Sequence, residues 1–118
     1  MKLHELTIKQ ARELLKKGAT SPKELTEAFL SRIESLDGKI KAFVTVTADE
    51  ARSMADKALE QMDKGVRDPG VPDPPLSGIP LGIKDNMCTK GVRTTCSSKM
   101  LENFVPPYES TATGRLWE

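Results

Sequence analysis

The feature that most constrains how this chain folds is a helix-start signature that occurs three times in its first 65 residues. In each case a hydroxyl side chain is followed three residues later by Glu or Gln, so the two side chains can cap the first helical turn reciprocally. Proline follows the second hydroxyl, and it suits the first helical position because no N–H donor is needed there. We therefore predict three helices. The capping pairs are Thr7 with Gln10, Ser21 with Glu24, and Thr47 with Glu50.

Each predicted helix carries an apolar stripe along one face, which indicates that it packs against other parts of the protein by that face. A glycine follows each stripe, and we expect Gly18, Gly38 and Gly65 to end the three helices. The stripes consist of Ile8, Ala11, Leu14 and Leu15; of Leu25, Ala28, Phe29, Ile33 and Leu36; and of Ala51, Met54, Ala55, Ala58, Leu59 and Met62.

Short β-rich and proline-rich stretches interrupt this helical pattern. Residues 66–75 are rich in proline and favour a linker or an exposed loop. The apolar residues within 76–86 predict a short strand that runs into a polar turn, and residues 42–46 form a second, shorter β-rich run. One or two short strands do not specify the order of a sheet.

The last part of the chain predicts two short helices. Residues 99–103 form the first of them, after a polar turn. Ser110 or Thr111 is expected to cap the second, which continues to Glu118 with no glycine, asparagine or proline to end it. A capped helix without a C-terminal signal is typical of a fragment.

The charge balance argues against direct nucleic-acid binding. Lysine and arginine total 18 and aspartate and glutamate total 17, so the formal net charge is +1. A surface that binds the phosphate backbone needs an excess of positive charge, which this composition lacks. The chain also has no run of about 18 apolar residues and no signal segment, so we expect no membrane association and a cytoplasmic protein.

The cysteines do not form a recognisable metal site. Cys88 and Cys96 are the only two, and the single histidine, His4, is distant in the sequence, so no zinc spacing exists. The spacing leaves a disulfide open, whereas the lack of a signal segment favours reduced thiols. A thiolate nucleophile would need a base that the fold brings close to it. We expect both cysteines to be small, partly buried side chains.

Residues 78–86, Gly-Ile-Pro-Leu-Gly-Ile-Lys-Asp-Asn, are the most informative about chemistry. In a strand, Lys84 would share a face with Gly82, which leaves open space beside it, and Asp85 would point the other way. If the rest of a protein covered Lys84, desolvation would lower its pKa, and a neutral lysine is a general base. A fall of roughly 3 units would make that base useful near neutral pH. From the residues alone, a solvated lysine at the end of a strand is the ordinary interpretation.

Three segments together resemble the opening of the amidase-signature family: residues 76–86, 94–104 and 106–111. The run Ser-Lys-Met-Leu-Glu-Asn-Phe in the second segment is more similar to the A subunits of tRNA-dependent amidotransferases than to general amidases. The resemblance covers essentially the whole chain and implies an α/β fold, a mixed sheet flanked by helices and preceded by a helical N-terminal region. We therefore expect residues 1–65 to form the helical region and residues 66–118 to begin a truncated amidase-signature core.

The resemblance also implies a catalytic role for one residue. Members of the family use a Ser, cis-Ser, Lys triad, in which the neutral lysine draws a proton through the cis-serine from the serine that attacks the amide carbonyl. Lys84 matches that lysine and is identified as the general base. Both serines and the glycine-rich oxyanion stretch lie downstream in the family and are absent here, as is a Gly-x-Ser-x-Gly elbow. Ser97 and Ser98 belong to a different family segment, so we expect them to be structural and the chain alone to be inactive.

The function that the resemblance implies is that of a glutaminase subunit, which hydrolyses glutamine and delivers ammonia for converting Glu-tRNA(Gln) or Asp-tRNA(Asn). The implied partners are subunits B and C, with aminoacyl-tRNA reached through the complex and not by this segment. No cofactor or metal is expected in this subunit, whereas ATP and magnesium are expected in the partner. Two alternatives stay open: a stand-alone amidase of the same family, and a non-catalytic interaction module. The choice between Glu-tRNA and Asp-tRNA also stays open.

Overall fold

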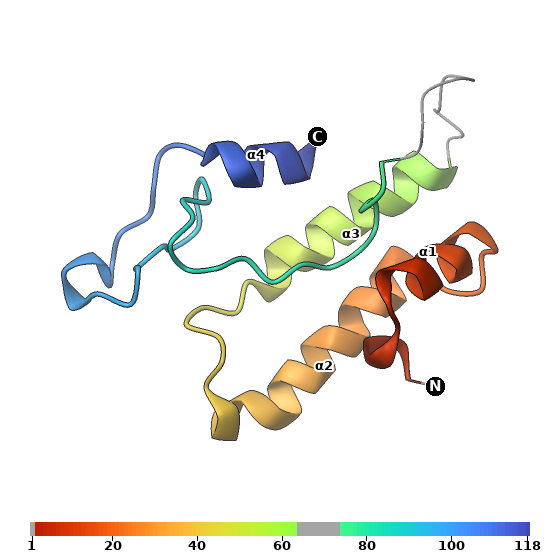
Figure 1. Ribbon diagram of the computed structural model, residues 1–118, viewed down its shortest axis with the longest axis horizontal. Helices are drawn as coiled ribbons and strands as arrows, with labels where there is room; N and C mark the ends of the chain where they lie inside the picture. Colours follow the sequence, from red (N-terminus) through yellow and green to blue (C-terminus); the bar gives the residue numbers. More distant parts are fainter. Residues whose placement is uncertain (1, 64–73) are drawn as a thin grey trace. The chain divides into compact units, whose positions relative to one another are not determined.

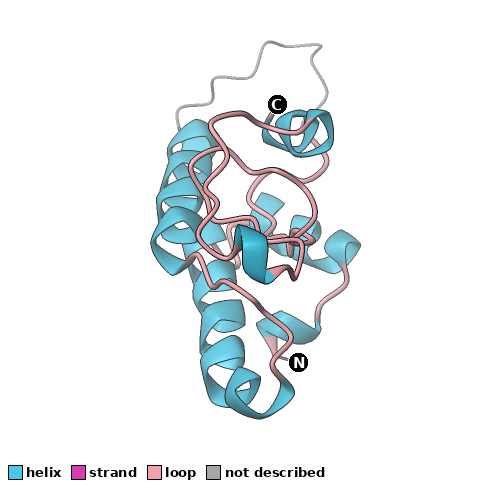
Figure 2. Ribbon diagram, turned by 90° about the vertical axis from the view of Figure 1, so that its left-hand side faces the viewer, coloured by secondary structure: helices cyan, strands magenta, loops and turns pink. Residues whose placement is uncertain are grey.

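The computed structural model describes residues 2–63 and 74–118 (Figure 1). Within these residues the chain forms helices and loops and no strand, as the colouring in Figure 2 shows. The elements are η1 (Leu3–Glu5), α1 (Ile8–Lys16), α2 (Pro22–Ile40), α3 (Ala48–Asp63), η2 (Lys99–Leu101) and α4 (Thr111–Trp117), where η marks a 3-10 helix.

The chain divides into two compact units. The first comprises Met1–Lys41 and Ala48–Pro80, and the second comprises Ala42–Thr47 and Leu81–Glu118. These are packing units within this chain, so the expected division of the intact protein between residues 65 and 66 stays a prediction. No helix among the described residues is long and apolar enough to cross a membrane.

The predicted helix starts are confirmed. At α1, Thr7 Oγ1 accepts from the Gln10 N–H at 3.3 Å, and Gln10 Oε1 accepts from the Thr7 N–H at 2.9 Å. At α2, Ser21 Oγ accepts from the Glu24 N–H at 3.2 Å, and Glu24 Oε2 accepts from the Ser21 N–H at 2.9 Å. Both are capping boxes. Helix α3 begins directly after Thr47, and the side chain of Ser110 caps α4.

The predicted helix ends are confirmed in one case and wrong in another. Gly18 follows α1 in the left-handed region, with φ +66°. Helix α2 runs through Gly38 and ends at Ile40. The next residue, Lys41, has a φ of 54°, and its N–H donates to the Asp37 carbonyl at 2.7 Å. A glycine inside a helix costs only about 1 kcal/mol relative to alanine, so it does not by itself end a helix. Gly65 lies outside the described residues.

The strand predicted within residues 76–86 is wrong for this chain, and so is the β-rich run at 42–46, since neither stretch forms a strand. A strand is stabilised by backbone hydrogen bonds to a neighbouring strand, and no such neighbour exists in the part of the chain that the structure describes. The backbone makes turns instead: the Ile79 N–H donates to the Leu76 carbonyl at 3.0 Å, and the Met87 N–H donates to the Lys84 carbonyl at 3.0 Å. The described residues therefore form no part of the expected mixed sheet.

The helix predicted at residues 99–103 is shorter than expected. Only Lys99–Leu101 are helical, and they form a single 3-10 turn. Ser98 Oγ accepts from the Met100 N–H at 3.3 Å and thereby caps that turn. The proline-rich linker predicted at residues 66–75 lies mostly outside the described residues, and its last two residues, Pro74 and Pro75, lead into a turn.

The apolar core of the first unit is built on α1 and α2. Ala11, Leu15 and Leu25 are buried there, and Leu25 is only 1% exposed. A turn at residues 75–78 packs closely on the start of α2, because a Cβ built on Gly78 would lie 2.9 Å from Pro22 Cγ. The partly buried side chains around this core are Leu3, Leu6, Phe29, Met62 and Ile79.

Exposed ion pairs join α2 and α3. Arg52 Nε contacts Glu27 Oε1 at 2.6 Å, and a second guanidinium nitrogen of Arg52 contacts Glu27 Oε2 at 3.3 Å. Lys23 Nζ lies 3.5 Å from Asp56 Oδ1. The two helices thus present complementary charges at their exposed edges.

Candidate active site

Lys84 lies in the second unit, where residues 81–84 lead into a turn. Its side chain is exposed, and its carbonyl closes the turn by accepting from the Met87 N–H at 3.0 Å. The space that the sequence predicted beside it is present, since a Cβ built on Gly82 would meet no atom within 4 Å. Within the described residues Lys84 forms no ion pair. Lys84 is therefore accessible and electrostatically unpaired in this part of the chain.

Asp85, the residue after Lys84, is tied to a turn ten residues further along the chain. Its Oδ1 accepts from the Thr95 N–H at 2.9 Å, and its Oδ2 accepts from the Thr95 hydroxyl and, at 3.4 Å, from the Ser97 N–H. The Asp85 carbonyl accepts from the Cys96 N–H at 2.9 Å. The hydroxyl of Thr95, followed by its N–H, holds the pKa of the Asp85 carboxyl below its ordinary value. Asp85 is thus a bound carboxylate.

The turn that binds Asp85, residues 95–98, has an unusual backbone. Cys96 and Ser97 both adopt the left-handed region, with φ of 50° and 56°. The Ser98 N–H donates to the Thr95 carbonyl at 2.9 Å, which closes the turn. Left-handed backbone is uncommon for residues other than glycine and persists only where the surroundings hold it. The bonds to Asp85 supply that support.

A second polar cluster surrounds the start of α4. Thr113 is fully buried, and its Oγ1 lies within hydrogen-bonding distance of the Cys88 carbonyl oxygen (3.2 Å), Ser110 Oγ (2.7 Å) and a carboxylate oxygen of Glu109. The Ser110 N–H donates to the same Cys88 carbonyl at 2.8 Å. The other Glu109 oxygen accepts from the Lys90 N–H at 3.4 Å. This cluster connects residues 88–90 to α4.

The other candidate nucleophiles have structural contacts. Ser97 is exposed and uses its N–H to bind Asp85, and Ser98 caps η2. Cys88 and Cys96 are free thiols, half-buried and exposed respectively. Cys88 Sγ lies 3.6 Å from Tyr108 Oη, and the hydrogen bond and Coulomb interaction with Cys88 raise the pKa of Tyr108. The expectation that Cys96 is partly buried is wrong, because its side chain is exposed. Among the described residues, no group of three or more side chains could hold a metal ion.

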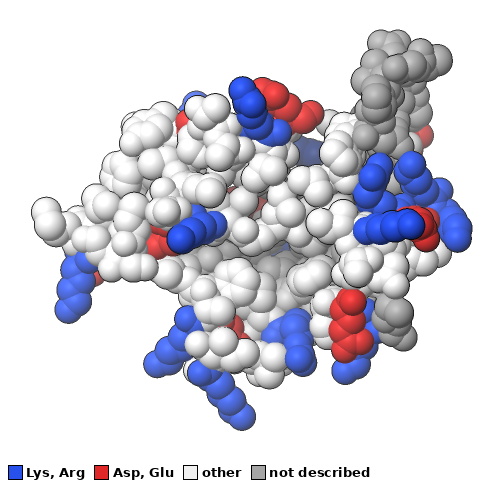
Figure 3. Space-filling model, viewed as in Figure 1, with Lys and Arg blue, Asp and Glu red and all other residues white. Residues whose placement is uncertain are grey.

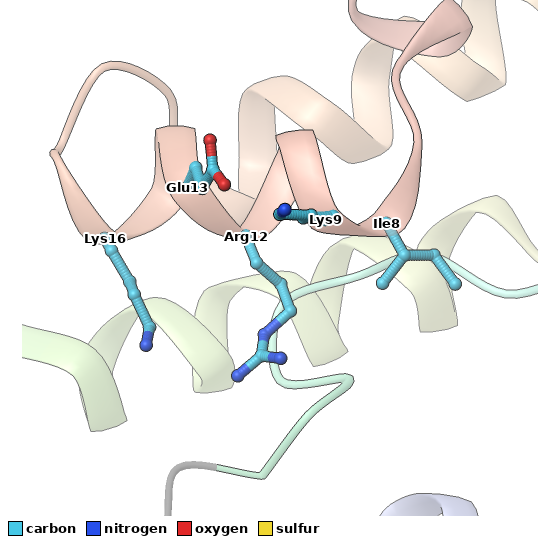
Figure 4. A pocket seen from close by; sticks show the side chains of 5 residues that line it. All are labelled: Ile8, Lys9, Arg12, Glu13 and Lys16. Carbon is cyan, nitrogen blue, oxygen red and sulfur yellow. The ribbon is translucent and has the colours of Figure 1, made fainter.

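Two shallow hollows lie on the first unit, on and beside α1. Figure 4 shows the first, where Arg12 and Lys16 extend from one side of the helix and Glu13 points the other way. On the face drawn in Figure 3, basic side chains stand beside acidic ones at several places. Lys84 belongs to the other unit and lines neither hollow. The linings are Ile8, Lys9, Arg12, Glu13 and Lys16, and Leu3, Leu6, Gln10, Glu13, Leu14 and Lys17.

The structure thus adds Asp85 and Thr95 to the residues that sequence reasoning associates with Lys84. From the sequence, Asp85 was expected only on the far face of a strand and Thr95 only in a polar turn. A bond between residues ten positions apart leaves no periodic signal in a single sequence, because it depends on how the intervening loop folds back.

Comparison with known proteins gives consistent matches. Residues 24–118 match the family described as Amidase. The chain is 52% identical over 113 residues to the A subunit of glutamyl-tRNA(Gln) amidotransferase from Prochlorococcus marinus (strain MIT 9313), covering 96% of this chain and 22% of that protein. Proteins of the same name from Synechococcus sp. (strain CC9605) and Dehalococcoides mccartyi are each 52% identical, over 100% and 97% of this chain. The chain spans 22–23% of the length of these three relatives.

Proposed function

Because the chain belongs to the amidase family, we propose that it is the N-terminal part of the glutamine-hydrolysing A subunit of a tRNA-dependent amidotransferase. The observation that carries this proposal is the identity of 50–54% to proteins of that name over 90–100% of the chain. The intact protein would release ammonia from glutamine for the amidation of Glu-tRNA(Gln), and of Asp-tRNA(Asn) where that substrate is used. A cytoplasmic location follows from this role.

In this proposal Lys84 is the general base of a Ser, cis-Ser, Lys triad. Two observations support this role: the Lys84 side chain is exposed, and there is open space beside Gly82. Other parts of the protein therefore have room to cover the lysine. Covering would remove water, disfavour the ammonium form and lower the pKa of Lys84 toward neutrality. The two serines would come from parts of the protein beyond this sequence. The chain alone is therefore expected to release no ammonia.

The proposal extends to the fold and the partners. Residues 79–84 would become a strand when neighbouring strands of a mixed α/β sheet are present, because the backbone N–H and C=O groups would then find ladder partners. Subunits B and C would complete a heterotrimer, and ATP and magnesium would act at the partner that activates the aminoacyl-tRNA. The glutamine-hydrolysing subunit itself would need no cofactor or metal.

The test compares Lys84→Arg and Lys84→Met in the intact protein, assembled with its partners. Arginine keeps the positive charge but does not deprotonate in a protein. If Lys84 is the base, both variants lose glutamine-dependent activity to a similar extent, on the order of 10² to 10⁴-fold, while the reaction driven by free ammonia persists. Lys99→Arg, at another exposed lysine of the same unit, is the matched control and should retain activity.

Two outcomes would reject this assignment. A Lys84→Arg variant with near-normal glutamine-dependent rates would show that the lysine acts only through its charge. An intact protein that hydrolyses small carboxamides but neither uses glutamine nor supports amidation of tRNA would instead be a stand-alone amidase of the same family.

A further inference from the structure

The side chain of Lys84 has no ion pair in the described residues, yet the backbone around it is fixed at two points. The Lys84 carbonyl accepts from the Met87 N–H at 3.0 Å, and the next residue, Asp85, is bound through both its carboxylate and its carbonyl. On the other side, nothing lies within 4 Å of a Cβ built on Gly82. The position of Lys84 therefore depends on what holds Asp85.

The polar contacts of Asp85 converge on one turn, residues 95–98. Thr95 supplies a hydroxyl and an N–H, Ser97 supplies an N–H, and Cys96 donates its N–H to the Asp85 carbonyl. The donors lie on a turn in which Cys96 and Ser97 adopt left-handed conformations, which cost free energy in residues other than glycine. Among the described residues, Asp85 forms these hydrogen bonds and no ion pair with Lys84.

We propose that Asp85 is a positioning residue for Lys84: bound by the turn at residues 95–98, it fixes the backbone from which the catalytic lysine extends. The proposal rests on the function proposed above, since it presumes that Lys84 is the base. Misplacement of a catalytic group by about 1 Å can lower a rate on the order of 10²-fold, so a small relaxation of this turn is enough to matter.

Three variants of the intact protein test the proposal. Asp85→Asn keeps one oxygen but places an NH₂ group where Oδ2 now accepts from Ser97 and Thr95. This NH₂ would face the Ser97 N–H, and the Thr95 hydroxyl would have to turn and accept instead of donating. Thr95→Val removes the hydroxyl and keeps the backbone donor, whereas Thr95→Ser keeps both. Glu102→Gln, at an exposed carboxylate of the same unit, is the matched control.

The readout is kcat per active site for glutamine hydrolysis, with KM measured alongside and the sites counted as folded protein from the helical circular dichroism. We expect Asp85→Asn to lose about 10²-fold in kcat per site, with KM nearly unchanged. Thr95→Val should lose about 10-fold, because it removes the hydroxyl that donates to Asp85 and accepts from the Ser97 N–H at 3.1 Å, while the Thr95 N–H still donates to Asp85. Thr95→Ser and Glu102→Gln should behave as the unchanged protein.

The outcomes separate positioning from stability and from failure of the proposed function. If Asp85→Asn or Thr95→Val lowers the number of active sites but leaves kcat per site within about twofold, the contacts only stabilise the fold and the proposal is overturned. If Asp85→Asn does not fold, Thr95→Val is compared with Thr95→Ser. Equal kcat per site in these two variants would overturn the proposal. An active Lys84→Arg variant would instead reject the role of Lys84 itself.

Discussion

The two compact units differ in the balance of apolar and polar side chains that they bury. In the first, the core cluster is apolar: Leu25, Leu15 and Ala11 are buried between capped helices, and Thr20 and Thr26 are buried beside them. In the second, the most buried side chains are Thr94, Thr95, Thr113 and Pro106, and hydrogen bonds connect the loops. The first unit is thus stabilised mainly by removal of apolar surface from water, which is non-directional. The second depends on polar contacts that each require a particular geometry.

This difference predicts different responses to mutation. In the first unit, loss of buried apolar volume should have the largest effect, and changes to exposed polar groups should have the smallest. In the second, loss of a single buried hydroxyl should matter, because each buried polar group that loses its partner keeps its desolvation cost. Single substitutions with matched controls can separate the two cases.

The largest effect is expected at Leu25, which is 1% exposed and lies in the core of α1 and α2. Leu25→Ala removes buried apolar surface and leaves a cavity, and such changes typically cost about 3 kcal/mol of unfolding free energy. Ile8→Ala, at an apolar side chain of α1 that is 52% exposed, is the control and should cost much less. The measurement is urea unfolding followed by helical circular dichroism. Equal losses at the two sites would contradict an apolar core in this unit.

The next effect concerns Gly78, where φ is +74° and a Cβ would lie 2.9 Å from Pro22 Cγ. Gly78→Ala adds left-handed strain and a steric clash, which together should cost about 2 kcal/mol. Gly18→Ala is the control, because Gly18 has φ +66° but no atom within 4 Å of the added Cβ. It should therefore show the strain alone. If the two variants unfold at the same urea concentration, the turn at residues 75–78 is not packed on α2.

The second unit provides the third test, at the fully buried Thr113. Thr113→Val keeps the shape but removes the hydroxyl that lies among the Cys88 carbonyl, Ser110 and Glu109. Each of these groups keeps one hydrogen bond from a backbone N–H, and loss of their bonds to the hydroxyl should cost about 1.5 kcal/mol. Amide hydrogen exchange should show it as faster exchange of the Ser110 N–H, which donates to the Cys88 carbonyl at 2.8 Å.

Thr111→Val is the control for that experiment, because Thr111 is an exposed threonine of the same helix. It should leave the exchange of the Ser110 N–H unchanged. A Thr113→Val variant that exchanges as slowly as the unchanged protein would show that packing, and not the hydroxyl, holds this part of the second unit.

The same contrast explains which features the sequence could predict. The starts of α1 and α2 were predictable because Thr7 with Gln10, and Ser21 with Glu24, are contacts within one helical turn. The end of α2 was not, because Gly38 permits a helix to continue and the left-handed position falls at Lys41. A local signal is therefore reliable at a helix start, where the capping side chains bond the first turn. It is weaker at a glycine, because glycine fits both the interior of a helix and its end.

The second unit was harder to predict because its contacts are not local. The stretch at residues 79–84 has the composition of a strand, but a strand needs a neighbour, and the described residues contain none. The bond from Asp85 to Thr95 spans ten residues and follows no periodicity. The role of Lys84 came from resemblance to a family and stays a prediction, because no contact among the described residues tests it.

The smallest effect is expected from the exposed ion pair of the first unit, where Arg52 Nε lies 2.6 Å from Glu27 Oε1. The hydrogen bond from Arg52 holds the pKa of Glu27 below its ordinary value of 4.5. A carboxyl whose pKa is lowered by folding stabilises the folded state above its unfolded pKa, and this contribution is lost as pH falls through the lower folded value. Both side chains are nearly half exposed, so water and salt screen the pair.

Glu27→Gln should therefore shift the urea midpoint less than Thr113→Val, with the difference confined to pH above about 4 and removed by about 1 M NaCl. Glu34→Gln, at an exposed carboxylate of α2, is the control. A large, salt-independent loss at Glu27 would mean that directed polar contacts stabilise the first unit as well, and the contrast between the two units would then fail.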